Sequence, residues 1–375
     1  MGTTNAAAGY KLPGTNLIGY ARYEMGIGES CRLAARSLER AGIPFGVYPF
    51  SGGCTSRDAD VSLEAAEIFA PEFAFNLMHV NADQMPVAYD ELGPGWFKGR
   101  YTIGYWHWEL PEFPDEYAAG FRYVNEVWVP SEFVARSIAA KSPVPVVRIP
   151  HGVEVNVAPG MTRGWFGLPE RRFLFLMMYD TFSYSPRKNP DSVIQAFKQA
   201  VLQFGLPADL VIKMNNPQPG ELGRIRRVTE GIPGIHLIHR TLSRAETNAL
   251  LASADCLVSL HRAEGFGLPI AEAMELGKPV IATNWSGNED FMTEDNSAPV
   301  RYRLTRIGRD YGPYRAHQMW AEPDLEHAVY LMRRVVYDEE WRRRISGEGR
   351  RTIRGFFSPE ASGRAMADRL ARITG

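Results

Sequence analysis

Short apolar runs alternate with helical segments along most of the 375-residue sequence. The runs cover residues 16–21, 44–50, 73–80, 101–106, 126–129, 144–149, 172–179, 210–214, 235–238, 254–260 and 278–283. Runs of this length are typical of buried strands, and strands that are separated by helices pair in parallel. The alternation therefore predicts an α/β fold with Rossmann-like parallel sheets, whose ligands bind beyond the carboxyl ends of the strands. From residue 322 onward the pattern predicts only helices.

The length of the chain indicates two domains. A chain of 375 residues is long for one domain and suits two of about 150 to 200 residues each, and its apolar fraction of 45% supplies ordinary cores. Residues 154–170 are rich in Gly, Pro and turn-forming residues, as linkers are. We therefore expect a first domain over residues 1–155 and a second over residues 171–355.

Composition narrows the class of protein. A run of about 18 apolar residues, which a membrane-spanning helix needs, does not occur, and the first residues lack the pattern of a secretion signal. Cys31, Cys54 and Cys256 have no metal-ligand spacing, and their odd number suits a reduced, cytoplasmic protein. The formal net charge is −1, with an acidic excess in residues 1–160 and a basic excess in the remainder. This asymmetry suits a cleft that holds an anionic ligand, and no nucleic-acid partner is expected.

The segment from His261 to Asp290 is the most informative about function. It contains Glu264 and Glu272 with Gly265, Phe266 and Gly267 between them. An apolar run ends just before Glu264, and Leu268 opens a stretch with helical spacing that has Pro269 near its first turn. Glu264 is therefore expected after a strand, and Glu272 in the first turns of the next helix.

This arrangement predicts a sugar nucleotide as the ligand. Free backbone N–H groups and the positive end of the helix dipole suit a phosphate, and Gly265 and Gly267 let it approach the main chain. An ionised carboxylate accepts hydrogen bonds from hydroxyls, so we expect Glu272 to bind the ribose diol and Glu264 to bind the sugar. The alternative is that both glutamates are solvated charges.

The string EGFGLPIAEAMELGKPVIAT resembles the E-x7-E signature of the retaining glycosyltransferases of the GT4 family, which have the GT-B fold. The resemblance implies two Rossmann-like domains that face each other across a cleft, with residues 356–375 forming a helix that returns to the first domain. It also implies transfer of a hexose, with retention, from a UDP- or GDP-linked sugar to a saccharide, glycolipid or other hydroxyl acceptor, as in polysaccharide biosynthesis. Beyond the donor substrate, no cofactor is implied.

Two features of the first half follow predicted strands. Gly26 and Gly28 form a GxG loop that fits a tight connection as well as a phosphate cradle, and the resemblance implies contact with the donor diphosphate. The run from Tyr105 to Trp108 offers stacking faces and a titratable group, although it also fits an aromatic core. The resemblance implies that His107 contacts the transferred sugar, with His79 as the alternative.

The loop over residues 180–189 carries the expected phosphate ligand of the second half. The resemblance implies that Lys188 binds the donor diphosphate. Many members of the family also have an arginine where this chain has Ser183, so Arg187 is the candidate to supply the second charge, with a solvated position as the alternative. Further donor contacts are expected from loop and helix-start residues, namely Asn215, Arg240, Leu242 and Leu268.

No metal site is expected. Asp58 and Asp60 have the spacing of a D-x-D motif but are interpreted as part of a surface turn, so the charge of the leaving diphosphate is expected to be met by Lys188 and backbone amides. Two other functions remain open, namely a sugar-nucleotide-binding protein without turnover and a nucleotide-sugar 2-epimerase. The arginines at positions 342–344, 350 and 351 are interpreted as a solvated face, with peripheral contact at a membrane surface as the alternative.

Overall fold

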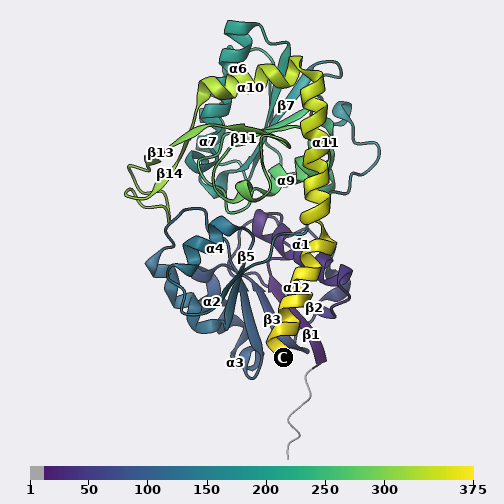
Figure 1. The fold of residues 1–375 in the computed structure, drawn as a ribbon, viewed down its shortest axis with the longest axis vertical. Helices are drawn as coiled ribbons and strands as arrows, with labels where there is room; N and C mark the ends of the chain where they lie inside the picture. The colour runs from purple at the N-terminus through teal and green to yellow at the C-terminus, as the bar shows by residue number, and fades with distance from the viewer. Residues whose placement is uncertain (1–11) are drawn as a thin grey trace, which may run out of the picture.

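The computed structural model describes residues 12–375 and consists of two α/β domains stacked along one axis (Figure 1). The first N-terminal residues, part of the segment in which no secretion signal is expected, lie outside the described residues. The first domain contains the strands β1 (Leu12–Gly19), β2 (Phe45–Pro49), β3 (Phe73–His79), β4 (Tyr101–Tyr105), β5 (Glu126–Val129) and β6 (Val146–Arg148). Its helices are α1 (Gly26–Arg40), α2 (Met85–Leu92), α3 (Pro94–Phe97) and α4 (Glu132–Ala139).

The second domain repeats this plan. Its main strands are β7 (Phe173–Asp180), β8 (Ala208–Asn215), β9 (Ile235–Ile238), β10 (Cys256–Ser259), β11 (Val280–Thr283) and β12 (Ala298–Val300). Its helices are α5 (Ser185–Lys188), α6 (Pro190–Phe204), α7 (Pro219–Thr229), α8 (Arg244–Ser253), α9 (Leu268–Glu275), α10 (Leu325–Tyr337) and α11 (Glu339–Phe356). Short 3₁₀ helices are η1 (Glu64–Ala66), η2 (Ala82–Gln84), η3 (Asp115–Tyr123), η4 (Arg163–Phe166), η5 (Thr181–Ser183) and η6 (Gly287–Asp290).

Within the described residues the strands form two parallel six-stranded sheets and one hairpin. The orders are β2-β1-β3-β4-β5-β6 and β12-β11-β10-β7-β8-β9, and every pairing within these two sheets is parallel. Each apolar run that was predicted to be a strand is one, with ends that differ by a few residues. The prediction of an α/β fold with two Rossmann-like sheets is therefore confirmed.

Helix α6 shows why some boundaries follow directly from the sequence. Asn189 adopts the left-handed conformation and its side chain accepts a hydrogen bond from the backbone of Ser192, while Pro190 occupies the first helical position. At the other end Gly205 has a φ of 62°, a conformation that glycine adopts without strain. These local signals fix both ends of the helix.

An antiparallel hairpin, β13 (Tyr302–Arg306) and β14 (Met319–Pro323), was not predicted. Most of β13 is exposed, so it lacks the apolar run by which the other strands were found. The expectation of helices from residue 322 onward is wrong for residues 322 and 323, because they end β14. The loop between the two strands reaches the first domain, where the Tyr314 hydroxyl donates to Glu109 Oε2 at 2.9 Å.

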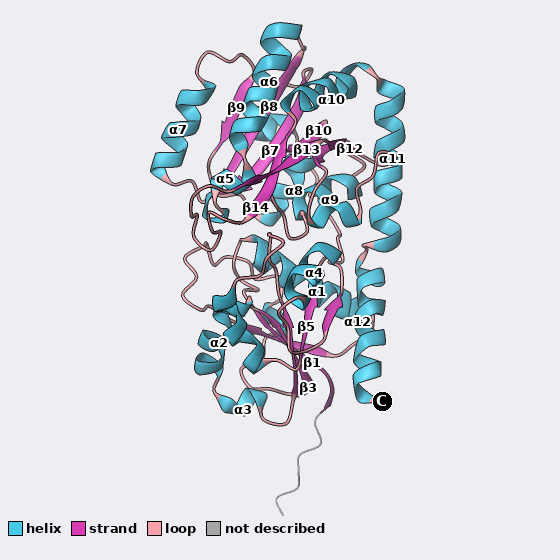
Figure 2. Cartoon of the chain, turned by 60° about the vertical axis from the view of Figure 1, so that its left-hand side comes forward, coloured by secondary structure: helices cyan, strands magenta, loops and turns pink. Residues whose placement is uncertain are grey.

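Helix α12 (Pro359–Thr374) continues from α11 and lies on the first domain, as both views show (Figure 1, Figure 2). Ser358 caps its first turn by accepting from the amide of Ala361. Met366 and Leu370 are buried in a core that includes residues of α1 and β1. Arg369 forms an ion pair with Glu126, a residue of β5 with no exposed surface.

Candidate active site

Three loops at the carboxyl ends of β7, β10 and β11 form a rim that faces the first domain. The amide of Glu264, after β10, donates to Ser286 Oγ at 2.9 Å, and the amide of Gly287 donates to the Glu264 carbonyl at 2.9 Å. A side chain at Gly287 would place its first carbon 2.1 Å from the Gly265 carbonyl oxygen. Glycine is therefore required for these two loops to meet.

Two cations from one loop converge on Glu264. Lys188 Nζ forms an ion pair with Glu264 Oε1, and Arg187 Nη1 lies 3.6 Å from Glu264 Oε2. Arg187 also donates to the Ala263 carbonyl at 2.9 Å. Burial alone would raise the pKa of the Glu264 carboxyl, but Lys188 and Arg187 lower it to about 2. The site therefore holds an ionised acceptor next to two positive charges.

Arg187 connects this rim to the first domain. Its Nη2 lies 3.8 Å from Glu109 Oε1, and its guanidinium lies 5.9 Å from the centre of the Tyr314 ring. Glu109 follows the run that begins at Tyr105, so the fold brings the aromatic run and the Lys188 loop together. Ser183, which lies in η5, carries no charge, and Arg187 is the second cation beside Glu264.

Glu272 takes part in an ion-pair chain between the domains. It lies in the first turns of α9, is 3% exposed and pairs with Arg244, the first residue of α8. Arg244 Nε lies 3.5 Å from Glu29 Oε1 of α1, in the other domain. Burial and Glu29 raise the pKa of Glu272 although Arg244 opposes the shift. Burial would also raise the pKa of Glu29, but Arg244 and its neighbours on α1 lower it.

The two glycines that were expected to approach the donor have different surroundings. A side chain at Gly28 would lie 2.2 Å from the Tyr23 carbonyl oxygen, so glycine is needed there for packing within the first domain. At Gly26 the equivalent position has no heavy atom within 4 Å, apart from its chain neighbours and the backbone of its own helix, in the described part of the chain. Both precede Glu29, which places them beside the Glu29–Arg244–Glu272 chain.

The remaining predicted donor contacts differ from one another in burial and in hydrogen-bond partners. Asn215 Nδ2 donates to Asp180 Oδ2 at 3.2 Å and to the Glu24 carbonyl of the first domain at 3.3 Å. Arg240 is exposed and pairs with Glu246. The side chains of Leu242 and Phe266 are buried in the core of the second domain, so only their backbone atoms could face a ligand. Gly267 has a φ of 94° and precedes Leu268, the first residue of α9.

The aromatic run of the first domain divides into core and site. Trp106 and Trp108 are buried, which agrees with the core alternative, whereas His107 is partly exposed. His107 Nε2 lies 3.2 Å from His151 Nε2 and 3.4 Å from Ser30 Oγ, which in turn lies 3.1 Å from His79 Nδ1. Burial lowers the pKa of His107 to about 4 and the pKa values of His79 and His151 well below their ordinary value, so all three rings are neutral at pH 7.

A chain of hydrogen bonds determines which ring nitrogen of His107 carries a proton. The Tyr105 hydroxyl donates to the Ile149 carbonyl at 2.6 Å and therefore accepts from Nδ1–H of His151 at 3.2 Å. Nε2 of His151 is then unprotonated and accepts from Nε2–H of His107. Nδ1 of His107 is left with a free lone pair, buried and without a hydrogen-bond partner in the described part of the chain.

Sequence reasoning missed four residues of this site: Glu29, Arg244, Tyr314 and His151. Arg244 directly follows the loop after β9 that carries Arg240 and Leu242, and His151 lies three residues after the end of β6, so position after a strand could have found both. No sequence signal places Glu29 and Tyr314 here, because their contacts depend on how the domains meet. Among residues 12–375, no group of three or more His, Cys, Asp or Glu side chains is arranged to hold a metal ion.

Residues 174–303, which include Lys188, Glu264 and Glu272, match the family model described as glycosyl transferases group 1. Over this segment the chain is similar to the group 1 glycosyltransferases, which confirms the predicted family resemblance there. The comparison with curated proteins found no match.

Solved structures with the GT-B fold resemble this chain over nearly its whole length. Sucrose-phosphate synthase from Thermosynechococcus elongatus has a TM-score of 0.69 and 14% identity, covering 97% of this chain and 99% of that one. HepE from Anabaena, in complex with UDP and glucose, has a TM-score of 0.67 and 14% identity, covering 96% and 100%. A glycosyltransferase from Rickettsia africae has a TM-score of 0.68 and 14% identity, covering 97% and 99%. These similarities confirm the predicted fold of two facing domains.

None of the helices in the described part of the chain is both long and apolar enough to span a bilayer.

Proposed function

We propose that this glycosyltransferase is a retaining enzyme of the GT4 type that transfers a hexose from a UDP- or GDP-linked sugar to a hydroxyl of a saccharide or glycolipid. The observation that carries the proposal is the convergence of Lys188 and Arg187 on Glu264, beside the start of α9 and opposite His107 and Glu109 of the first domain. Two cations next to an ionised acceptor suit a diphosphate joined to a sugar.

Lys188 and Arg187 would stabilise the leaving group. The nucleoside diphosphate gains negative charge as its bond to the sugar breaks, and fixed cations in a partly buried site stabilise that charge in the transition state. The amides at the start of α9 would contribute as well. The donor diphosphate would draw Lys188 away from Glu264, leaving the carboxylate to accept from sugar hydroxyls.

Transfer with retention follows from attack on the face that the leaving group departs from. The bond between the sugar anomeric carbon and the diphosphate oxygen breaks, and the acceptor oxygen bonds to the same carbon. The acceptor proton passes to the departing phosphate oxygen, so no dedicated base is needed. His107, whose side chain is partly exposed, would contact a hydroxyl of the transferred sugar.

We assign the acceptor to a cavity of about 320 Å³ in the first domain, which is lined in part by Tyr20, Met25, Asn81 and Asp83. Asn81 Oδ1 accepts from the amide of His107 at 2.9 Å, so the cavity adjoins the residue assigned to the sugar. Its polar and aromatic lining suits a hydroxyl-rich acceptor.

The decisive experiment incubates the protein with UDP-, GDP- and ADP-linked sugars and measures release of the nucleotide, with and without simple saccharide acceptors. Turnover that depends on an acceptor, with a product of unchanged anomeric configuration by NMR, supports the proposal. An inverted product would overturn retention. Epimerised donor without transfer would favour the epimerase, and binding without turnover would favour the inactive binding protein.

Replacing Glu272 by Ala should weaken binding of free nucleoside diphosphate by about 1.5 to 3 kcal/mol, the range for hydrogen bonds to a charged group. The reason is that the ribose diol would displace Arg244 and donate to this carboxylate. Calorimetric titration measures the change. Glu275→Gln is the matched control, because Glu275 lies on the same helix but pairs with Arg354 at 2.9 Å. Equal affinities for parent and Glu272→Ala would refute the ribose assignment.

His107→Ala should lower kcat by about tenfold, as expected for a lost hydrogen bond of about 1.5 kcal/mol, and leave nucleoside diphosphate affinity unchanged. An interaction made chiefly with the reacting sugar affects turnover more than binding of the nucleotide. Steady-state kinetics and titration are compared for this variant and for His79→Ala. A parallel loss of turnover and affinity would place His107 in the core instead.

Activity should persist in excess chelator, because Lys188, Arg187 and backbone amides are proposed to balance the diphosphate charge. The rate of nucleotide release is measured before and after addition of EDTA. A loss of turnover that Mg²⁺ or Mn²⁺ restores would contradict this part of the proposal.

A further inference from the structure

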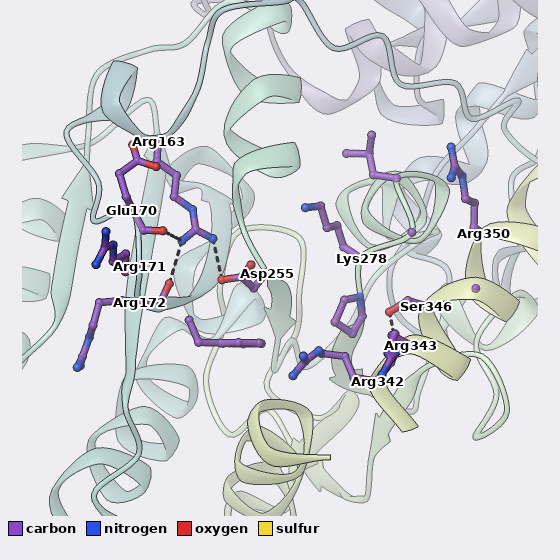
Figure 3. A pocket seen from close by; sticks show the side chains of 15 residues that line it. Arg163, Glu170, Arg171, Arg172, Asp255, Lys278, Arg342, Arg343, Ser346 and Arg350 are labelled. Carbon is purple, nitrogen blue, oxygen red and sulfur yellow. Dashed lines mark hydrogen bonds and ion pairs between the residues drawn. The ribbon is translucent and has the colours of Figure 1, made fainter. Parts of the chain in front are cut away.

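A cavity of about 800 Å³ opens at the end of the second domain opposite the candidate active site (Figure 3). Its lining includes Phe173, Asp255 and Pro279, which lie at or just before the amino ends of β7, β10 and β11. Glu264 and Lys188 follow the carboxyl ends of β10 and β7, so the length of the sheet separates the two sites. Nothing in the proposed transfer reaction uses this cavity.

The cavity has an excess of unpaired positive charge. Seven arginines and lysines line it against two acids, Glu170 and Asp255. Arg163 is paired with Asp255 at 2.7 Å. For Arg171, Lys278, Arg342 and Arg350, by contrast, no carboxylate of residues 12–375 lies within ion-pair distance. Positive charges that line one cavity without counter-charges attract an anion.

The unpaired cations are contributed by separate segments of the chain. Arg171 belongs to the stretch that leads from the first domain into β7, Lys278 to the turn before β11, and Arg342 and Arg350 to α11. Figure 3 shows these side chains on different sides of the opening. The stretch before β7 and α11, which continues into α12, are the two connections between the domains. An anion here would therefore contact both.

We propose that this cavity binds a ligand with two or more phosphate groups, either a phosphorylated metabolite or a phosphorylated lipid head group, and that the ligand ties the inter-domain linker to α11. Guanidinium groups match phosphate oxygens with paired hydrogen bonds, which favours phosphate over other anions. Four unpaired cations across a cavity of this size exceed what one phosphate neutralises. The arginines that were interpreted as a solvated face thus include Arg342 and Arg350 of a defined site.

The test uses inorganic tripolyphosphate as the soluble probe and, as the lipid probe, phosphatidylcholine vesicles with or without cardiolipin, whose head group carries two phosphates. Binding is measured by calorimetry and by co-sedimentation for the parent, the double variant Lys278→Gln/Arg350→Gln, and the control Arg344→Gln/Arg364→Gln. The control removes the same charge from exposed positions outside the cavity. Lys188→Met is titrated as well, because tripolyphosphate could also bind at the candidate active site. Thermal unfolding verifies that each variant is folded.

Loss of tripolyphosphate affinity by at least about tenfold in the cavity variant, with the control unchanged and whatever Lys188→Met does at the candidate active site, supports a soluble ligand. Loss of sedimentation with cardiolipin vesicles in the cavity variant alone supports a lipid head group. The proposal is overturned if neither probe binds the parent, or if the control loses as much affinity for the probes as the cavity variant does. It is also overturned if only Lys188→Met loses affinity. These outcomes do not depend on transfer activity.

Discussion

Replacement of Lys188 by Met is expected to lower kcat by about 100- to 1,000-fold, the loss seen when one fixed group that stabilises transition-state charge is removed. Met keeps most of the side-chain volume, so the loss reports charge more than packing. Arg187 stays beside Glu264 in this variant and would limit the loss, because its guanidinium lies 3.6 Å from the carboxylate. Free nucleoside diphosphate should also bind more weakly, but by less than kcat falls.

The measurement compares steady-state rates of nucleotide release for the parent, Lys188→Met and Lys198→Met. Lys198 is exposed on α6, the helix after the Lys188 loop, and serves as the matched control. Retention of more than half of the parent rate by Lys188→Met would mean that Lys188 serves only to neutralise Glu264. The doubly substituted Arg187→Met/Lys188→Met chain then decides whether Arg187 replaces the arginine that is absent at Ser183.

Replacement of Arg369 by Met is expected to lower the free energy of unfolding by about 3 kcal/mol, near the lower end of the range for breaking a buried ion pair. Arg369 of α12 meets Glu126 of β5 at 3.1 and 3.2 Å through Nε, and Glu126 has no exposed surface. Without the guanidinium this carboxylate is buried and has no cation. The Tyr101 hydroxyl, 3.2 Å away, keeps the loss from being larger.

Urea denaturation of Arg369→Met and of the control Arg372→Met measures this effect. Arg372 lies on the same helix and is exposed, so its loss should change stability by less than about 0.5 kcal/mol. Adding Glu126→Gln to Arg369→Met should restore part of the stability, because it removes the buried charge and keeps an acceptor. If Arg369→Met unfolds like the parent, the ion pair contributes nothing to holding α12 on the first domain.

The fold was predictable from sequence because its strands are buried on both faces and therefore appear as apolar runs. The ends of α6 are likewise encoded locally, because Asn189 caps its start and Gly205 follows its end. Strand β13 was missed because its residues are mostly exposed, and an exposed strand has no apolar run. What positions that hairpin is contact with the other domain, which local sequence does not encode.

The candidate site was predictable to the extent that its residues follow strands within one domain. Glu264 was expected at the sugar of the donor and Lys188, from the family resemblance, at its diphosphate, and the structure pairs the two side chains. The partner of Glu272 was not predicted: Arg244 is 28 positions earlier in the chain and itself leads to Glu29 of the other domain. Such pairs arise from tertiary packing, so periodicity and motif spacing carry no information about them.

The position of α12 has a consequence for how the protein is made. A ribosome synthesises the whole second domain after β6 and before α12, the helix that covers α1. Until α12 is made, the apolar surface that Met366 and Leu370 cover is exposed on the nascent first domain, and Glu126 lacks its partner Arg369. The first domain therefore cannot complete its fold while it alone has left the ribosome. A premature stop anywhere in the second domain would release a first domain that is prone to aggregation and proteolysis, although its own sheet is fully encoded.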